Sequence, residues 1–168
     1  PERICGAVGY TYNIGKYEVT AGQYTAFLNA KAKTDTYGLY NPTMWDGSGC
    51  KIQRSGTSGN FTYSVAPEYA NRPVNSVSYW NACRFTNWLH NGQRAGMQNA
   101  STTEDGTYTL TPTGIANNTI TRNPGAHWAI ASEDEWYKAA YYNPGAGTYY
   151  LYATSSNTAP SNALSNPL

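Results

Sequence analysis

The spacing of apolar and polar positions predicts a first amphipathic helix soon after the start of the chain. Tyr24, Phe27 and Leu28 recur at helical spacing and lie on one face. Thr20 precedes them, and Gln23 follows it at the distance of a capping box, in which the hydroxyl and the amide side chain satisfy free backbone N–H groups. We therefore expect a helix to begin directly after Thr20.

A second helix is predicted to begin at Ser78, because a long apolar stripe follows this hydroxyl. Asn91 and Gly92 supply the stop signal at its C-terminal end. The stripe is unusually rich in aromatic side chains and comprises Trp80, Cys83, Phe85, Trp88 and Leu89.

Ser132 and Glu135 form a second capping-box pattern and predict a third helix, which continues through Trp136. The turn sequence Asn-Pro-Gly at 143–145 ends it. Residues 128–131 are apolar and predict a short buried strand just before this helix.

Strand patterns are short and scattered. Residues 8–17 mix Tyr, Ile and Gly and predict a strand or hairpin edge. Residues 105–120 resemble a decorated hairpin, and residues 149–153 predict one further strand. Residues 155–168 are typical of a loop.

Residues 34–70 form a loop-rich insertion dominated by Gly, Ser, Tyr and Asn, with Trp45 and Cys50 as candidate anchors. Within it, residues 52–54 and 61–65 predict two short strands. An irregular segment of this length needs packing of its own.

Composition places residues 1–168 in a single folded domain. Charged residues make up 12% of the chain, about half the usual share, while Tyr occurs 16 times, so the chain is too aromatic and too weakly charged to be disordered. A surface rich in Tyr, Asn and Thr favours an extracellular or cell-envelope location. The net charge of +1 gives no basis for binding nucleic acid, and no apolar run is long enough to span a membrane.

The three cysteines have no zinc-ligand spacing. Cys83 lies within the apolar stripe of the second helix and is interpreted as a small buried residue. Cys5 and Cys50 lie in Gly-flanked, loop-like sequence, so they are the candidate disulfide pair in an oxidising compartment.

Three segments then occur in a characteristic order. They are Tyr-Glu-Val-Thr at 17–20, Pro-Val-Asn-Ser-Val-Ser at 73–78, and Ile-Ala-Ser-Glu-Asp-Glu-Trp at 130–136. Together they resemble the formylglycine-generating-enzyme (sulfatase-modifying factor) family, over roughly residues 8–165. The sequences of these segments are similar to those of a secreted, planctomycete-type bacterial branch of the family. The resemblance implies an irregular α+β fold of the C-type-lectin-like kind, with few helices and short antiparallel strands.

The residues that carry this resemblance are interpreted as structural landmarks: capping hydroxyls, a proline-led strand and tryptophan anchors. Glu18 and Glu135 are carboxylates that general acid–base catalysis can use, but a cap or a buried ion pair is the simpler interpretation. His90 and His127 are interpreted as structural imidazoles, since they are far apart in sequence. The landmarks are Glu18, Thr20, Pro73, Ser78, Trp88, Ser132, Glu135 and Trp136.

The family's second half carries Gly-Asn-x-Trp-Glu-Trp, Arg-Gly-Gly-Ser and Gly-Phe-Arg motifs, and none of them occurs in this chain. In formylglycine generators two cysteines of that half bind copper(I), which requires two soft thiolates close in space. We therefore interpret the chain as the N-terminal part of such a domain, with its C-terminal part missing. No cofactor is expected in it; calcium or copper would need the missing part.

Three functions remain open at this point. The first is a secreted, non-catalytic module that acts in binding or extracellular assembly. The second is a fragment of a metal-dependent oxidase that converts a sulfatase cysteine to formylglycine. The third is a subunit of an extracellular filament or layer.

An incomplete core favours a protein partner or self-association that covers it. Glycans are further candidate partners, and Asn60, Asn99 and Asn117 match the N-glycosylation pattern.

Overall fold

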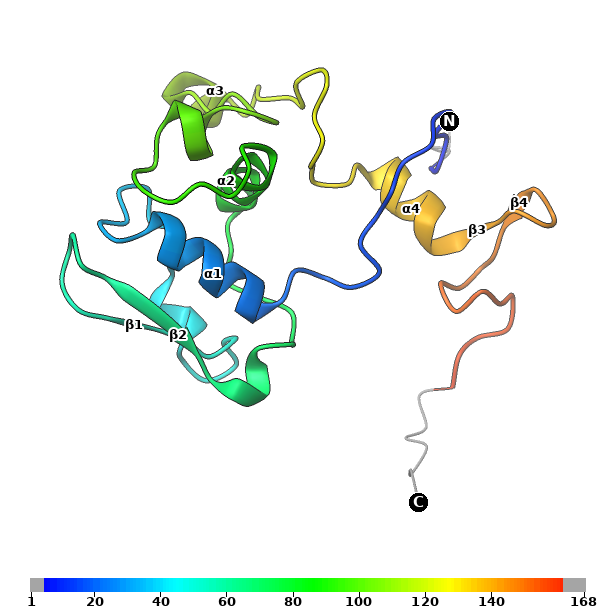
Figure 1. Cartoon of the computed structure of the whole chain (residues 1–168). Helices are drawn as coiled ribbons and strands as arrows, with labels where there is room; N and C mark the ends of the chain where they lie inside the picture. The colour runs from blue at the N-terminus through cyan, green and yellow to red at the C-terminus, as the bar shows by residue number, and fades with distance from the viewer. Residues whose placement is uncertain (1–4, 162–168) are drawn as a thin grey trace. The chain divides into compact units, whose positions relative to one another are not determined.

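The computed structural model describes residues 5–161, which form short helices and two-stranded antiparallel sheets connected by long loops (Figure 1). The α+β class is therefore confirmed. The chain divides into two compact units. Residues 16–130 form the central unit, and residues 5–15 and 131–161 form the terminal unit. The assignment of residues 1–168 to one domain stays a prediction.

The first helix of the central unit, α1 (Ala21–Lys31), begins as the sequence predicts. The Thr20 hydroxyl accepts a hydrogen bond from the Gln23 N–H at 3.2 Å, and the Gln23 side chain accepts one from the Thr20 N–H at 2.9 Å. The predicted apolar face is fully buried and consists of Tyr24, Phe27 and Leu28.

The second helix, α2 (Tyr79–His90), packs against α1. The Ser78 hydroxyl caps it by accepting from the Asn81 N–H, and the helix ends before Asn91. Phe27 lies 5.4 Å from Phe85 and 5.1 Å from Trp88, measured between ring centroids. These rings form the centre of the larger core cluster, and each buried ring contributes about 2 kcal/mol of hydrophobic stabilisation.

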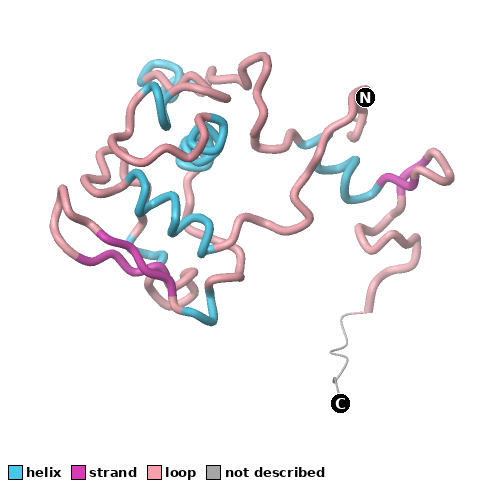
Figure 2. The backbone as a smooth tube through the Cα atoms, in the orientation of Figure 1, coloured by secondary structure: helices cyan, strands magenta, loops and turns pink. Residues whose placement is uncertain are grey.

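The loop-rich insertion at 34–70 packs on α1 through a β-hairpin, shown in magenta in Figure 2. Strand β1 (Ile52–Ser55) pairs antiparallel with β2 (Thr62–Val65), which confirms the two predicted strands. Two single turns flank the hairpin, η1 (Pro42–Met44) and η2 (Pro67–Tyr69).

One polar side chain fixes the hairpin to the helix. The amide of Asn29 on α1 donates to the Tyr63 carbonyl at 2.8 Å and accepts from the Tyr63 N–H at 2.9 Å, as a third strand would. The Tyr63 hydroxyl donates to the Ala32 carbonyl at 2.8 Å. Two residues of the insertion were predicted to be anchors. Cys50 is buried as predicted, whereas Trp45 is 44% exposed, so the prediction for Trp45 is wrong.

The rest of the central unit corrects the predicted hairpin at 105–120. A helix, α3 (Pro112–Asn117), lies within it, because the Thr111 hydroxyl caps the first turn and Pro112 suits the first helical position. Only a single antiparallel bridge, Tyr108 to Arg122, remains of the pairing among the described residues there. A π-turn, η3 (Ala100–Glu104), precedes this region.

The terminal unit contains α4 (Glu133–Tyr141), which begins at the predicted Ser132 capping box. Strand β3 (Tyr142–Asn143) pairs with β4 (Thr148–Tyr149), so the strand predicted at 149–153 is shorter and begins earlier. The predicted C-terminal loop extends beyond the described residues.

Two predicted strands, at 8–17 and 128–131, are absent from the part of the chain that the structure describes. At 8–17 the Lys138 ammonium donates to the Val8 carbonyl at 2.5 Å, and at 128–131 side-chain hydroxyls supply hydrogen bonds that a strand partner would supply. The Thr107 hydroxyl donates to the Trp128 carbonyl, and the Ile130 N–H donates to the Tyr108 hydroxyl. Trp128 is 55% exposed rather than buried. Across residues 5–161, no helix has the length and apolar character that crossing a membrane requires.

Candidate functional site

The family landmarks serve mainly as structural groups. Thr20, Ser78 and Ser132 are the N-caps of α1, α2 and α4. Trp88 is buried in the larger core cluster, as an anchor should be. Trp136 is 54% exposed, so its interpretation as a core anchor is wrong: on α4 its ring contacts Tyr141 at the surface instead.

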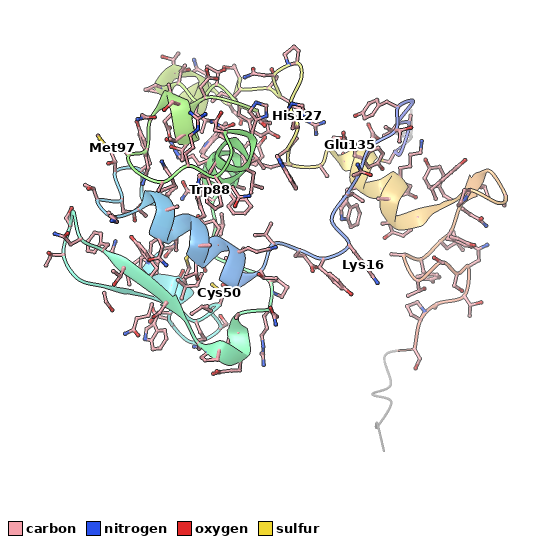
Figure 3. The ribbon with its side chains drawn as sticks, viewed as in Figure 1. Lys16, Cys50, Trp88, Met97, His127 and Glu135 are labelled. Atoms are coloured by element: carbon pink, nitrogen blue, oxygen red, sulfur yellow. The ribbon has the colours of Figure 1, made fainter. Side chains whose placement is uncertain are left out.

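The two landmark carboxylates have different surroundings. Glu135 is buried and completes the α4 capping box, accepting from the Ser132 N–H at 2.7 Å. Its other oxygen accepts from the Tyr10 hydroxyl at 2.7 Å, so both oxygens hold structure together, and Figure 3 labels its position. Glu18 is exposed and lines a shallow depression of about 410 Å³ with Pro73 and Tyr17.

No disulfide bond joins the three cysteines in the structure. Cys5 belongs to the terminal unit and Cys50 to the central unit, so their pairing stays a prediction. Cys83 is fully buried on α2, and burial raises the pKa of its thiol to about 11. A thiol with that pKa is neutral at physiological pH and is neither a nucleophile nor a ready metal ligand.

The two histidines lie together although they are distant in sequence. Their rings stack with centroids 5.4 Å apart, and the backbone N–H of His127 donates to His90 Nδ1 at 3.3 Å. The interpretation as structural imidazoles agrees with this contact, because His90 uses its lone pair to hold the loop that carries His127. Across residues 5–161, no three His, Cys, Asp or Glu side chains form a group that can hold a metal ion.

A polar depression of about 490 Å³ lies where the start of α2 faces the loop at 37–42. We call it the Arg84 depression. Its walls combine three aromatic rings with hydroxyl, amide and guanidinium groups; they are Tyr37, Gly38, Tyr40, Asn41, Pro42, Ser76, Ser78, Trp80, Asn81 and Arg84.

Arg84 is the charged residue of this depression, and its side chain is only 7% exposed. Nε and Nη2 donate to the two carboxylate oxygens of Glu104, at 2.8 and 2.9 Å. Nη1 donates to Asn81 Oδ1 at 3.2 Å. The Tyr37 ring lies over the guanidinium, with its centroid 4.4 Å from Cζ.

The local folding of the chain explains this arrangement. Positions 80, 81 and 84 lie on neighbouring faces of the first turns of α2, so Trp80, Asn81 and Arg84 all reach the depression. The π-turn η3 supplies Glu104, whose carboxylate also accepts from the Thr103 hydroxyl at 2.9 Å.

The opposite wall is held by a short loop. The Asn81 amide donates to the Gly38 carbonyl at 2.8 Å. The Asp35 carboxylate accepts from the backbone N–H groups of Leu39 and Tyr40, at 2.7 and 3.2 Å. The backbone of residues 38–40 is therefore held by hydrogen bonds within the protein itself.

The sequence pattern did not single out Arg84 or Glu104. The only available signal was a cation within the aromatic stripe of α2, between Cys83 and Phe85. Such a cation needs a partner when buried, but the partner lies twenty residues away and its position follows only from the fold.

Comparison with known proteins identifies the family. The model of the sulfatase-modifying factor enzyme 1-like domain matches residues 8–166. The chain belongs to this family. The resemblance carried by the three ordered segments is therefore confirmed at the family level, while the planctomycete-type branch and the restriction to an N-terminal part stay predictions. No curated protein and no solved structure matches the chain.

The thiols of the central unit do not fit the copper(I) chemistry of this family. Cys50 belongs to the larger core cluster, and Cys83 to a second, smaller cluster with Tyr108 and Leu110. The Cys50 sulfur contacts the Asn75 carbonyl at 4.0 Å. Two thiolates converging on one ion are needed for such a site, and these two residues do not supply them.

Proposed function

We propose that this protein is a non-catalytic binding module of the sulfatase-modifying factor family that acts at the cell envelope or outside the cell. The observation that carries the proposal is the Arg84 depression, a polar recess with fixed walls. Its groups bind and orient a ligand, and its ion pair is already satisfied within the protein. Concave sites with a few fixed polar groups are the usual form of ligand sites.

The depression contains no group suited to covalent chemistry. Its serine hydroxyls, Ser76 and Ser78, have no histidine or carboxylate among the lining residues to act as a base. Ser78 also accepts the capping hydrogen bond of α2, so its lone pair is used for structure. These features support recognition of a ligand and not its conversion.

The test is a titration followed by NMR, with uniformly ¹⁵N-labelled protein and a panel of soluble saccharides and extracellular peptides. We expect at least one class to shift the amide signals of residues 37–42 and 76–84 saturably, and the ligand to be recovered unchanged. Recovery of a chemically altered ligand, or the absence of any saturable shift, contradicts the proposal.

A parallel assay addresses the oxidase alternative directly. The protein is incubated with copper(I), oxygen and a cysteine-containing peptide, and the peptide is analysed by mass spectrometry. We expect the cysteine to be recovered intact. Formation of formylglycine that is lost in Cys50→Ser or Cys83→Ser protein would establish the chain as an enzyme.

Self-association is a second candidate function, favoured by large apolar side chains on the surface. Tyr17 is 75% exposed in the central unit, and Leu151 and Trp136 are 71% and 54% exposed in the terminal unit. A second copy of the chain that covered them would gain hydrophobic burial. Sedimentation velocity over a hundredfold concentration range tests this: a growing sedimentation coefficient supports assembly, and a constant monomer value removes it.

A further inference from the structure

The electrostatics of the Arg84 depression select against an anionic ligand. The edge of a guanidinium that binds carboxylates and phosphates in a two-point manner is the Nε–Nη2 edge or the Nη1–Nη2 edge. In Arg84 the first of these edges is taken by Glu104, which also cancels the positive charge. An anion entering the depression would therefore meet a guanidinium whose charge Glu104 already compensates.

Hydrogen-bonding capacity nevertheless remains on the walls. The Asn41 side-chain oxygen accepts from the N–H and the hydroxyl of Thr43, at 3.0 and 2.9 Å. Its amide nitrogen has no protein partner within the part of the chain that the structure describes, and it can donate to a ligand. The Ser76 hydroxyl, also on the wall, can both donate and accept. Uncharged groups with oxygen atoms, such as hydroxyls, match these donors.

The aromatic walls are held in place before a ligand arrives. One face of Tyr37 lies on the Arg84 guanidinium, and the residue is 44% exposed, so part of it is open to solvent. Tyr40 is fixed between Arg54, 4.9 Å from its ring centroid, and Tyr63, 5.5 Å away. Trp80 contacts Tyr79 edge to face at 4.9 Å.

The negatively charged faces of such rings attract polarised C–H groups. A pyranose ring offers C–H groups on its faces and hydroxyls around its rim, which is the combination that these walls can bind. The volume of about 490 Å³ also lies within the usual range of small-molecule sites, about 300–1,000 Å³.

We propose that the Arg84 depression binds an uncharged saccharide, with a sugar ring stacked on Tyr37 and its hydroxyls bonded to Asn41, Ser76 and the Nη1 end of Arg84. This inference rests on the proposed function, because it names the ligand class of the same site.

The experiment is a titration of the ¹⁵N-labelled protein with methyl glucoside, methyl galactoside and methyl mannoside, each compared with glucuronate and inorganic sulfate. We expect at least one neutral glycoside to bind with a roughly millimolar Kd, as a single small ring with few contacts should. We also expect that Kd to change less than about twofold between 50 and 500 mM NaCl, since no net charge is involved.

Matched variants test the place of binding. Tyr37→Ala is expected to weaken binding of the glycoside at least about tenfold, whereas Tyr37→Phe, which keeps the ring, retains it within about twofold. Trp45→Ala is the control, because Trp45 is an aromatic residue as exposed as Tyr37 but outside the depression, and its loss should leave binding unchanged. The spectrum of each free variant verifies that it is folded.

The outcomes separate this inference from the proposed function. If glucuronate or sulfate binds more tightly than the glycosides, or if Tyr37→Ala has no effect, the saccharide inference is wrong. If only a peptide shifts the signals of the depression, the inference is wrong and the binding function stands. If nothing in either titration binds, both are wrong.

Discussion

Arg84 shows how one side chain can be central to a site and still be hard to find in a sequence. Its guanidinium lies among aromatic residues, where an unpaired charge would be very unfavourable. The Glu104 carboxylate supplies the opposite charge that offsets this cost. Buried ion pairs of this kind add little net stability, but removing one partner leaves the other charge buried alone. The pair therefore acts to fix geometry in the Arg84 depression.

Replacing Glu104 by Gln is expected to lower the free energy of unfolding by about 3 kcal/mol, because Arg84 would keep its charge without a counter-ion. Urea unfolding followed by tryptophan fluorescence measures the change. Glu68→Gln is the control: Glu68 is exposed, so its substitution should change stability by no more than about 0.5 kcal/mol. Equal effects of the two substitutions would show that the pair is not buried as described.

At the scale of the elements, the three predicted helix starts were confirmed, whereas the strands predicted at 8–17 and 128–131 were not. The hydroxyls of Thr20 and Ser132 cap helices through contacts within three residues, so the signal is local. The strands expected at 8–17 and 128–131 depended on partners elsewhere in the chain. The Lys138 ammonium bonds the Val8 carbonyl instead, and the Tyr108 hydroxyl accepts from the Ile130 N–H. Strand formation is a property of two segments, and a pattern in one of them does not decide it.

The loop that joins η1 to β1 provides a sharp test at this scale. A Cβ added to Gly49 would lie 2.2 Å from the Thr43 carbonyl oxygen and 2.4 Å from that of Met44, whereas one added to Gly47 would meet nothing within 4 Å. Gly49→Ala is therefore expected to cost about 2 kcal/mol or more of stability, since backbone atoms must move.

Gly47→Ala is the matched control in the same loop, and we expect it to change stability by less than about 0.5 kcal/mol. Thermal unfolding by circular dichroism compares both variants with the parent protein. If Gly49→Ala unfolds at the parent temperature, the loop does not pass as closely over η1 as the structure has it.

For the whole molecule, stability depends on pH because the two core clusters contain ionisable side chains. These include the thiol of Cys83 and the phenol groups of Tyr63 and Tyr24. Burial raises the pKa of Cys83 to about 11 and that of Tyr63 to about 12, and it raises the pKa of Tyr24 further. The native state thus keeps these protons at pH values where the unfolded chain, with ordinary values near 9 and 10, begins to lose them.

Because the unfolded state then binds fewer protons than the native state, stability must fall as pH rises above about 9. Below that pH both states are protonated at these groups, and they contribute no pH dependence. Urea unfolding at pH 7.5, 9, 10 and 11 should show this decline, and Cys83→Ala protein should decline less steeply between pH 9 and 11. A flat profile up to pH 11 would show that these groups ionise equally in both states.

The family, the helix starts and the apolar faces were determined by the sequence alone, because capping and helical periodicity act over a few residues. The exposure of Trp136 was not predicted, because its place in a family segment does not indicate which neighbouring residues cover it. The Arg84 depression was decided by the tertiary structure. Its ion pair, its Tyr37 wall and its contact between Asn81 and Gly38 join segments that only folding brings within hydrogen-bonding distance.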